Sequence, residues 1–219
     1  MKNIAIIPAR GGSKRLLNKN CLLLDGIPLI AYSIIEAKKN NAIIGAVYVS
    51  TDDDQVKEIA LSYGAMVIDR PLHLAGDLEP TVTALKHVLE TIGDEVDAVF
   101  LLQPTNPLRP SNLIAEAYQL FIDNQSDSLM TVTRNNQKLG KIIDSKFVPF
   151  NYLIGQRSQD LEPLYFENGL LYIIKRELIL QEKITGENNF PMIVDHPFAD
   201  VDIDTQDDFD YAEYLISKS

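Results

Sequence analysis

The sequence predicts an α/β fold in which helices cover both faces of a mostly parallel, twisted sheet, giving three layers. Short apolar runs rich in β-branched residues alternate with segments whose apolar residues recur at helical spacing. Such alternation is typical of βαβ units, in which a helix crosses between parallel strands. The length of 219 residues, 46% of them hydrophobic, suits one domain with a sizeable core.

Six apolar runs are expected to form the buried strands. The run DAVFLL is the strongest of them, and NIAIIP is β-branched and bounded by a loop. The predicted strands are 3–8, 45–50, 65–68, 97–102, 128–133 and 169–174. Because ligands gather beyond the carboxyl ends of strands in an open parallel sheet, a site is expected in the loops that follow these runs.

The segments between the strands carry helix signals. Pro28 suits a first helical turn, Asp52 or Asp53 can cap the second helix, and Gly64 is a natural stop for it. Pro110 marks the start of another helix. The expected helices are 28–41, the segment that follows the aspartates, 80–92, 110–124 and 206–217.

The alternation stops between the last two predicted strands. The segment 135–168 is polar and rich in turn residues, which predicts an insertion such as an antiparallel flap or a dimer arm. No Gly/Ser-rich linker marks a domain break. We therefore expect one domain, 1–219, with an insertion around 135–168.

Composition excludes several classes of protein. A net charge of −11 argues against a broad nucleic-acid surface and against docking on anionic lipid. The single cysteine, Cys21, excludes an internal disulfide and a thiolate metal cluster. The N-terminal apolar run, 4–9, is too short for a signal peptide, and no run approaches the ~20 residues of a membrane span. We expect a cytoplasmic protein without nucleic-acid or membrane partners.

The loop after the first predicted strand concentrates positive charge in this acidic chain. It reads ARGGSKRLLNKN, and its glycines let the backbone approach an anion closely while the Ser13 hydroxyl adds a donor. The loop cations singled out for phosphate are Arg10, Lys14 and Lys19. Neither the Walker pattern nor GxGxxG is present. The loop predicts a polyphosphate cradle, and the plainer alternative is a glycine turn with solvated lysines.

Two aspartates near the C-terminus predict a metal site. Asp202 and Asp204 stand two positions apart in DVDIDT, so on an extended segment they project to the same face. Two carboxylates suit Mg²⁺, which also takes phosphate oxygens and waters. Two alternatives remain: aspartates before a helix often cap it, as we expect for Asp207 and Asp208, and acidic clusters are often only solvated.

Taken together, these stretches resemble the acylneuraminate cytidylyltransferases, which make CMP-activated nonulosonic acids such as CMP-sialic acid. The loop IIPARGGSKR…NKN is similar to the N-terminal signature of that family. Later stretches match further family motifs in order: VSTDDD (49–54), DRPLHLAGD (69–77), LLQPTNPLR (101–109), FENGLLYI (166–173) and DVDIDTQDDFDYAE (200–213). The resemblance covers nearly the whole chain and implies a Rossmann-like nucleotidyltransferase fold.

The resemblance implies a reaction and its residues. In the family, the anomeric hydroxyl of the sugar attacks the α-phosphorus of CTP and pyrophosphate leaves. An enzyme catalyses such a transfer mostly by positioning the reactants and neutralising charge. The implied catalytic residues are Arg10, Lys14, Lys19 and Asp204, and the implied Mg²⁺ ligands are Asp202 and Asp204. The implied CTP contacts are Ala9, Arg10, Gly11, Gly12, Ser13, Lys14, Lys19, Asn20, Arg70, Ala75 and Thr81.

The implied sugar contacts are Gln103, Arg157, Asn168 and Tyr172. Gln103 has a plainer reading as a loop amide that satisfies local backbone, and Tyr172 as a core aromatic of a strand. Arg109 has two readings, substrate binding or pairing with an acid, and the structural one is expected. A homodimer formed through the segment near 140–165 is implied by the family alone.

Departures from the family pattern leave the sugar open. Leu17 stands where proline is common, and Arg15 where sialic-acid versions often have glycine. Phe166 stands where some sialic-acid enzymes have an arginine, and Glu167 follows it. Legionaminic, pseudaminic or another eight- or nine-carbon keto acid is therefore as suitable as N-acetylneuraminate.

Three other functions were weighed against this one. A nucleotide-sugar glycosyltransferase can use a D-x-D metal site, but it would not need a GGSK loop in the first βα turn. A HAD-type phosphatase would carry its aspartates directly after the first strand, whereas Asp202 lies near the C-terminus. A non-catalytic nucleotide-binding regulator remains an alternative, although the loop lysines and both aspartates are present.

Overall fold

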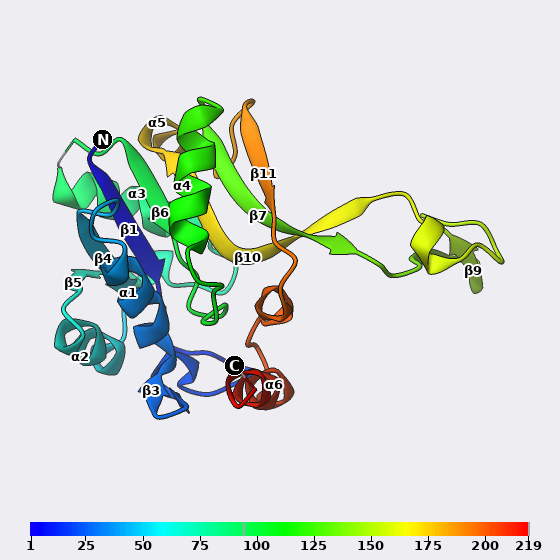
Figure 1. Cartoon of the computed structure of the whole chain (residues 1–219). Helices are drawn as coiled ribbons and strands as arrows, with labels where there is room; N and C mark the ends of the chain where they lie inside the picture. Colours follow the sequence, from blue (N-terminus) through cyan, green and yellow to red (C-terminus); the bar gives the residue numbers. More distant parts are fainter. Residues whose placement is uncertain (94, 219) are drawn as a thin grey trace.

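A seven-stranded sheet forms the centre of the computed structural model, which describes residues 1–93 and 95–218 (Figure 1). The strand order is β11-β7-β10-β6-β1-β4-β5. The strands are β1 (Asn3–Pro8), β4 (Ala46–Thr51), β5 (Met66–Asp69), β6 (Ala98–Leu101), β7 (Ser128–Asn135), β10 (Leu164–Lys175) and β11 (Asn189–Ile193). Only β10 runs antiparallel to its neighbours β6 and β7, so the prediction of a mostly parallel sheet is confirmed.

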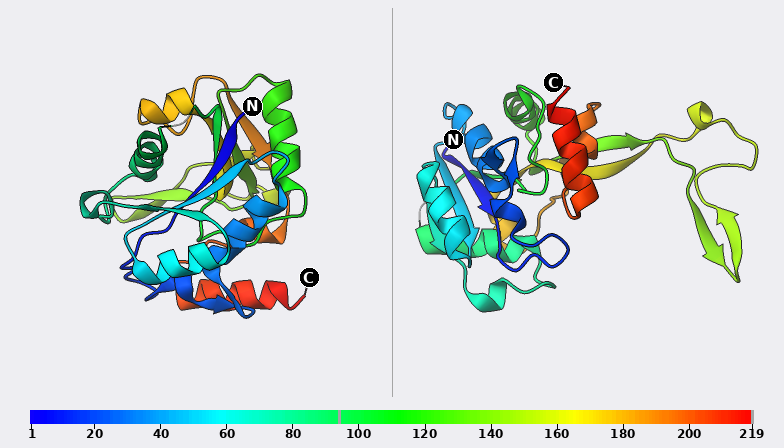
Figure 2. Two further views of the ribbon diagram at one scale, coloured as in Figure 1. Left: turned by 90° about the vertical axis from the view of Figure 1, so that its left-hand side faces the viewer. Right: turned by 90° about the horizontal axis from the view of Figure 1, so that it is seen from below.

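Helices cover both faces of this sheet, as predicted (Figure 2). The helices are α1 (Leu29–Lys39), α2 (Asp54–Ser62), α3 (Thr81–Ile92), α4 (Leu113–Asp123), α5 (Arg176–Leu180) and α6 (Gln206–Ile216). One apolar core joins α1, α2 and α4 to the sheet, and a second joins α3 and α5 to its other face. None of the described helices is both long and apolar enough to cross a membrane.

Local signals explain where several helices begin. The Val56 amide donates to the Asp53 carboxylate over 2.9 Å, so Asp53 caps α2 as expected. Thr205 and Asp208 form a capping box at the start of α6. Helix α4 begins at Leu113 rather than at 110, because Asn112 before it adopts a left-handed φ of 66°.

A third apolar cluster lies beyond the main sheet, under α6. It joins Leu24, Leu29, Leu108 and Phe209 to the segment that precedes α6. Short strands β2 (Leu23–Leu24) and β3 (Ile27–Pro28) form a hairpin beside this helix. The sequence did not predict this hairpin, α5 or β11. The hairpin strands and α5 are short, and β11 contains a proline, which a strand tolerates only at a sheet edge.

The predicted insertion is an arm that extends away from the sheet (Figures 1 and 2). The arm, residues 136–163, contains the antiparallel hairpin of β8 (Gly140–Ile143) and β9 (Lys146–Pro149) and continues into β10, which starts five residues before the predicted 169. Its surface carries large exposed apolar side chains: Ile142, Ile143, Phe147, Val148, Phe150, Leu153 and Ile154. Such a surface is unusual for a segment that stays in water.

Strand register brings the predicted motifs to one edge of the sheet. In β1, Pro8 is opposite Ser50 of β4, and Ile6 is opposite Leu101 of β6. The carboxyl ends of these parallel strands therefore lie together. The loops that follow them (9–20, 52–53 and 102–112) meet at that edge.

Candidate functional site

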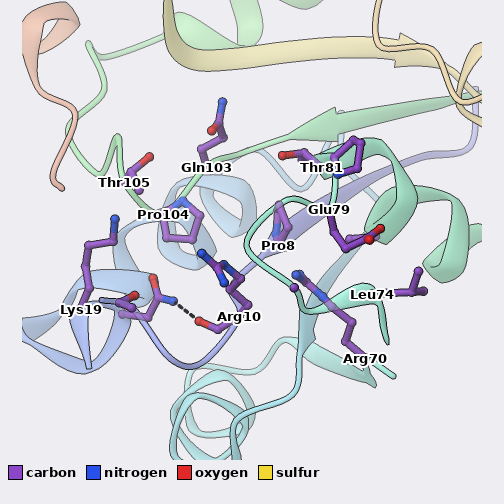
Figure 3. Close-up of a pocket in the computed structure, with 15 residues that line it drawn as sticks. Pro8, Arg10, Lys19, Arg70, Leu74, Glu79, Thr81, Gln103, Pro104 and Thr105 are labelled. Carbon is purple, nitrogen blue, oxygen red and sulfur yellow. Dashed lines mark hydrogen bonds between the residues drawn. The ribbon is translucent and has the colours of Figure 1, made fainter. Parts of the chain in front are cut away.

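A cavity of about 180 Å³ lies where these loops meet (Figure 3). Its lining includes many of the residues predicted to bind nucleotide or sugar: Arg10, Ser13, Lys19, Asn20, Arg70, Thr81 and Gln103. They come from the loop after β1, the end of β5, the start of α3 and the loop after β6. A mostly polar cavity at the carboxyl edge of a parallel sheet is a typical place for a small-molecule site.

The glycines of the first loop have different structural tasks. Gly12 adopts a φ of +67° and faces open space. A Cβ on Gly11 would lie 3.0 Å from the Asp53 carboxylate, so the close approach of the two loops needs glycine. The Gly11 amide donates to Asp52 over 2.8 Å. This amide was expected to face an anion, and in the structure it instead ties the loop to the start of α2.

The loop cations are already matched with carboxylates. Asp77 accepts from Arg10 over 2.6 Å and also pairs with Lys14. Asp204 accepts from Lys19 over 2.8 Å, and Arg15 lies 3.1 Å from its other oxygen. These six side chains line a second hollow of about 280 Å³. Two carboxylates face four cations there, so an anion of higher charge can compete for the cations.

Charge pairing changes the acidity of Asp77. The Lys14 ammonium, and then the Arg10 guanidinium, hold the pKa of the Asp77 carboxyl below its usual range. Asp77 therefore stays ionised at neutral pH and keeps both cations occupied. Arg10 also donates to the Ala75 carbonyl over 3.3 Å, which ties the segment 71–80 to the loop.

Lys19 joins the two ends of the chain. Its buried ammonium donates to the Ile203 carbonyl over 2.7 Å as well as to Asp204, 185 positions along the sequence. Asn20 supports the same loop, because its amide donates to the Arg10 carbonyl over 3.1 Å (Figure 3). The sequence motifs at the two termini thus form one site.

Arg70 forms another wall of the cavity. It is buried and donates to the Ser50 hydroxyl over 3.1 Å and to the Ser50 carbonyl over 2.7 Å. Burial lowers the pKa of Arg70 to about 10, partly offset by Asp52. Thr81 begins α3 at the same cavity, whereas the side chains of Ala9 and Ala75 do not line it. Ala9 is buried in the core instead.

A third hollow, of about 390 Å³, adjoins the cavity through Gln103. Its lining includes Tyr172 and Asn168, which were expected to contact the sugar, the expected metal ligand Asp202, and Glu167. The Tyr172 hydroxyl donates to Glu167 over 3.0 Å, and burial, followed by the Glu167 charge, raises the pKa of Tyr172. Among the described residues, the lining of this hollow holds acids but no lysine or arginine.

Asn168, expected to contact the sugar, lines the third hollow and also makes hydrogen bonds within the protein. Its side-chain oxygen accepts from the Thr131 hydroxyl over 2.6 Å and from the Leu170 amide over 3.1 Å, while its nitrogen donates to Thr133 over 3.0 Å. The register of β10 against β7 shifts between Glu167 and Tyr172. Asn168 therefore fixes this bulge, and both its side-chain oxygen and its side-chain nitrogen make hydrogen bonds within the protein.

The predicted metal ligands alternate with core residues. Val201 and Ile203 are buried, whereas Asp202 and Asp204 project outward, as the spacing predicts. The two carboxylates line different hollows, Asp202 beside Tyr172 and Asp204 beside the loop cations. Within the described residues, no group of three or more His, Cys, Asp or Glu side chains could hold a metal.

Two carboxylates nevertheless fit Mg²⁺, which binds through one or two carboxylates plus substrate phosphates and waters. Desolvation raises the pKa of Asp202, a hydrogen bond from Thr105 opposes this, and the Asp204 charge raises it further. A cation between the two carboxylates would relieve that repulsion. The donor set therefore suits a hard divalent cation.

Some predicted residues are not brought together. Arg157 lies on the arm, pairs with Asp160 over 2.8 Å and 3.1 Å, and lines none of the three hollows. Arg109 is structural as expected, but its partners are the Leu170 and Gln103 carbonyls and the Ser33 hydroxyl rather than an acid. Burial lowers the pKa of Arg109 to about 10.

Sequence reasoning missed the roles of Asp52, Asp77 and Asn106. The aspartates lie within quoted motifs, and the excess of basic residues in the first loop was the signal that acidic partners were needed. Nothing in their spacing identifies which of the chain's 31 acidic residues would supply them. Asn106 has no local signal for its role, because the two carbonyls to which it donates lie 62 and 95 positions away.

Comparison with known proteins shows the family of this chain. A family model described as cytidylyltransferase matches residues 4–218. The chain is 34% identical to the pseudaminic acid cytidylyltransferase of Campylobacter jejuni over 98% of this chain and 96% of that protein. It is 36% identical to the N-acylneuraminate cytidylyltransferase of Escherichia coli over 96% of this chain and 51% of that longer protein.

A solved structure is also similar. It is that of CMP:2-keto-3-deoxy-manno-octonic acid synthetase complexed with CTP, which superposes with a TM-score of 0.74 over 100% of this chain and 99% of that chain. At 19% sequence identity, this likeness shows the fold alone.

Proposed function

Because this chain belongs to the cytidylyltransferase family, we propose that it transfers CMP from CTP to the anomeric hydroxyl of a nonulosonic acid. The hydroxyl oxygen forms a bond to the α-phosphorus of CTP, and the bond from this phosphorus to the bridging oxygen breaks. Pyrophosphate leaves, carrying the hydroxyl proton in the net balance. The observation that carries the proposal is the Lys19–Asp204 contact, which joins the glycine loop to the carboxylate segment.

The first loop would hold the triphosphate. Phosphate oxygens would bind Arg10, Lys14 and Lys19 in place of the carboxylates that pair with them, Asp77 and Asp204. Ser13 adds a hydroxyl donor at the same cavity. Their charge neutralises the developing negative charge of the departing pyrophosphate, which is the main task in phosphoryl-type transfer.

Asp202 and Asp204 are the residues that would hold Mg²⁺. When bound, Mg²⁺ supplies positive charge beside the triphosphate. The two carboxylates face different hollows, so they stand between the loop and the hollow beside Tyr172. This placement supports a role at the boundary between nucleotide and sugar.

The cytosine end would lie against Arg70 and Thr81. Both line the main cavity, and buried Arg70 has its guanidinium fixed on Ser50. A pyrimidine is selected through hydrogen bonds to its O2, N3 and N4 edge, and a fixed donor gives such selectivity. A cytoplasmic location, expected from the sequence, fits a reaction that consumes CTP.

The sugar would occupy the hollow that contains Gln103, Glu167 and Tyr172. Acidic and amide side chains there accept hydrogen bonds from hydroxyl and N–H groups. The two curated relatives named above act on pseudaminic acid and on N-acylneuraminate, so the sugar class fits this chain and the individual sugar stays open. Arg157 does not line this hollow within the chain, so in this proposal it would come from a second copy.

We also propose a homodimer formed through the arm. The arm extends from the body (Figure 1). It exposes large apolar side chains, which a second copy could bury. In this proposal the arm is both the dimerisation element and the route by which Arg157 meets the sugar of the partner.

The test is a direct assay of the purified protein with Mg²⁺, CTP and a panel of keto acids: N-acetylneuraminate, legionaminic, pseudaminic and 3-deoxy-manno-octulosonic acid. Pyrophosphate release with at least one acid, and not with CTP alone, is the expected result. Lys14→Ala serves as the inactive control, because Lys14 is exposed and its loss leaves the core intact. Release from no acid, or turnover of UDP-sugars instead, would contradict the proposal.

A further inference from the structure

Asn106 occupies an unusual position in the loop after β6. It is buried, and its side-chain nitrogen donates to two main-chain carbonyls from distant segments. One is the Asn168 carbonyl in β10, 3.0 Å away, and the other is the Val201 carbonyl before α6, 2.8 Å away. A single amide therefore holds three parts of the chain together.

Those two segments carry the chemistry of the proposed site. Asn168 lies within the bulge of β10, between Glu167 and Tyr172 at the sugar hollow. Val201 directly precedes Asp202. The amide of Ile203, which lies between the two aspartates, donates to the Thr105 carbonyl over 2.8 Å. The loop thus holds the β10 bulge and the carboxylate segment 201–204 in place relative to each other.

An asparagine is suited to this position by its donors. The two N–H groups of its amide serve the two carbonyls, while its oxygen accepts from the Thr105 hydroxyl over 3.1 Å. Aspartate would place a carboxylate against two carbonyl oxygens, and alanine would leave both carbonyls without these bonds in a buried place.

The opposite backbone is shaped to accept Asn106. Gly169 adopts a φ of +74°, and a Cβ there would lie 2.6 Å from the Asn106 side-chain oxygen. A side chain at that position would therefore push the amide away. The bulge and the asparagine fit each other at a place where neither is required by local secondary structure.

We propose that Asn106 is a positioning residue of the transfer reaction, which fixes the 201–204 carboxylate segment against the β10 bulge. The proposal rests on the proposed function, because it assigns Asp202 and Asp204 to a divalent cation. Supporting side chains behind metal ligands usually change metal affinity or activity by about 10- to 100-fold when removed.

The experiment compares Asn106→Ala with Asn3→Ala as a matched control. Asn3 is also buried, and its amide donates to the Ile43 carbonyl over 3.2 Å, but it begins β1 at the opposite edge of the sheet. Manganous ion is titrated into each variant in the presence of CTP without sugar, and free Mn²⁺ is followed by electron paramagnetic resonance. Thermal unfolding and pyrophosphate release at varied Mg²⁺ are measured alongside.

Asn106→Ala is expected to weaken Mn²⁺ binding and raise the half-saturating Mg²⁺ concentration by about 10-fold or more, with kcat about 10- to 100-fold lower. Asn3→Ala is expected to lower the unfolding temperature while both metal affinities stay at wild-type values. Asn106→Ser, which keeps one donor, should fall between alanine and wild type, and it replaces Asn106→Ala if the latter does not fold.

Two outcomes separate failure of this inference from failure of the proposed function. Wild-type metal affinity and kcat in the folded Asn106 variants would overturn the positioning role while leaving the reaction intact. A wild-type protein that neither binds Mn²⁺ with CTP nor releases pyrophosphate would contradict the proposed function itself, on which this inference rests.

Discussion

The edge of the sheet that carries the site and the arm are opposite in character. At the edge, four loop cations face carboxylates from segments far away in sequence, and buried Asn106 and Arg109 hold the loops together. On the arm, apolar side chains are exposed, and the polar contacts are local, as between Arg157 and Asp160. The polar groups at the edge are paired within one chain, whereas the arm leaves large apolar side chains exposed.

The largest effect on activity is expected from removing the Asp204 carboxylate at this edge of the sheet. Asp204→Ala removes the partner of Lys19 and Arg15 and one of the two carboxylates that suit Mg²⁺. We expect kcat to fall by at least about a thousandfold with the fold retained, because the side chain is partly exposed. Pyrophosphate release and circular dichroism measure the two effects.

Asp207→Ala is the matched control for this change. Asp207 lies in the first turn of α6 and lines none of the three hollows described above. Its activity should stay near that of the wild type. Equal rates in the two variants would mean that Asp204 has no special role.

The next largest effect is expected on stability, from a residue that holds the loops of this edge together without a proposed part in the reaction. Arg109→Met removes bonds to two carbonyls and a hydroxyl while keeping much of the side-chain volume. Leaving these buried groups without partners should lower the free energy of unfolding by about 2–4 kcal/mol. At about 2–4 °C per kcal/mol for a chain of this size, calorimetry should show a clear drop in Tm.

Lys57→Met provides the comparison, because Lys57 makes an exposed ion pair with Asp69. Its Tm should remain within about 2 °C of the wild type. An Arg109 variant as stable as the Lys57 variant would show that the buried guanidinium adds nothing to the scaffold.

The arm is tested by making its apolar surface charged. Ile142→Asp combined with Leu153→Asp should weaken a homodimer by at least about thirtyfold, the effect of one interface hot spot. Both side chains are exposed in the single chain, so its unfolding should be little changed. Sedimentation velocity measures the association, and Leu61→Asp on α2 is the control. A wild-type protein that sediments as a monomer at all concentrations would contradict the dimer.

The smallest effect concerns the carboxylate that occupies the loop cations. Asp77→Asn frees Arg10 and Lys14 for phosphate, so the KM for CTP should fall by about two- to fivefold. Because its folded-state pKa is depressed, the Asp77 pairing is present at neutral pH and is lost only as pH falls through that lowered value. Asp69→Asn is the control, and a raised KM in Asp77→Asn would show that Asp77 assists binding.

Much of the fold could be predicted because its signals are local. The apolar residues of β1 and β6 are almost fully buried, as expected for central strands, and Asp53 caps α2 from within its own turn. The direction of β10 could not be predicted, since an apolar run is the same whichever way it crosses the sheet. The insertion was predicted from its turn residues, but the sequence left open whether it forms a flap or an arm.

The candidate site likewise contains residues that the sequence could identify and contacts that only the tertiary structure shows. Arg10, Lys19 and Asp204 could be selected from residue type and motif order, and the structure brings them together. Asn168 could be selected too, yet its side chain proves to be engaged with Thr131 and Thr133. Motif letters identify a residue near a site, but they do not say which of its atoms remain free.

The sequence by itself determined the alternation of strands and helices, the cationic glycine loop and the acidic pair, because each depends on residues a few positions apart. Only the tertiary structure decided that Lys19 meets Asp204, that Asp77 occupies the loop cations and that Asn106 joins β10 to the carboxylate segment. The physical reason is that these contacts join residues far apart in the sequence, which only the arrangement of the strands brings together. Their partners are then set by packing and register rather than by neighbours in the chain.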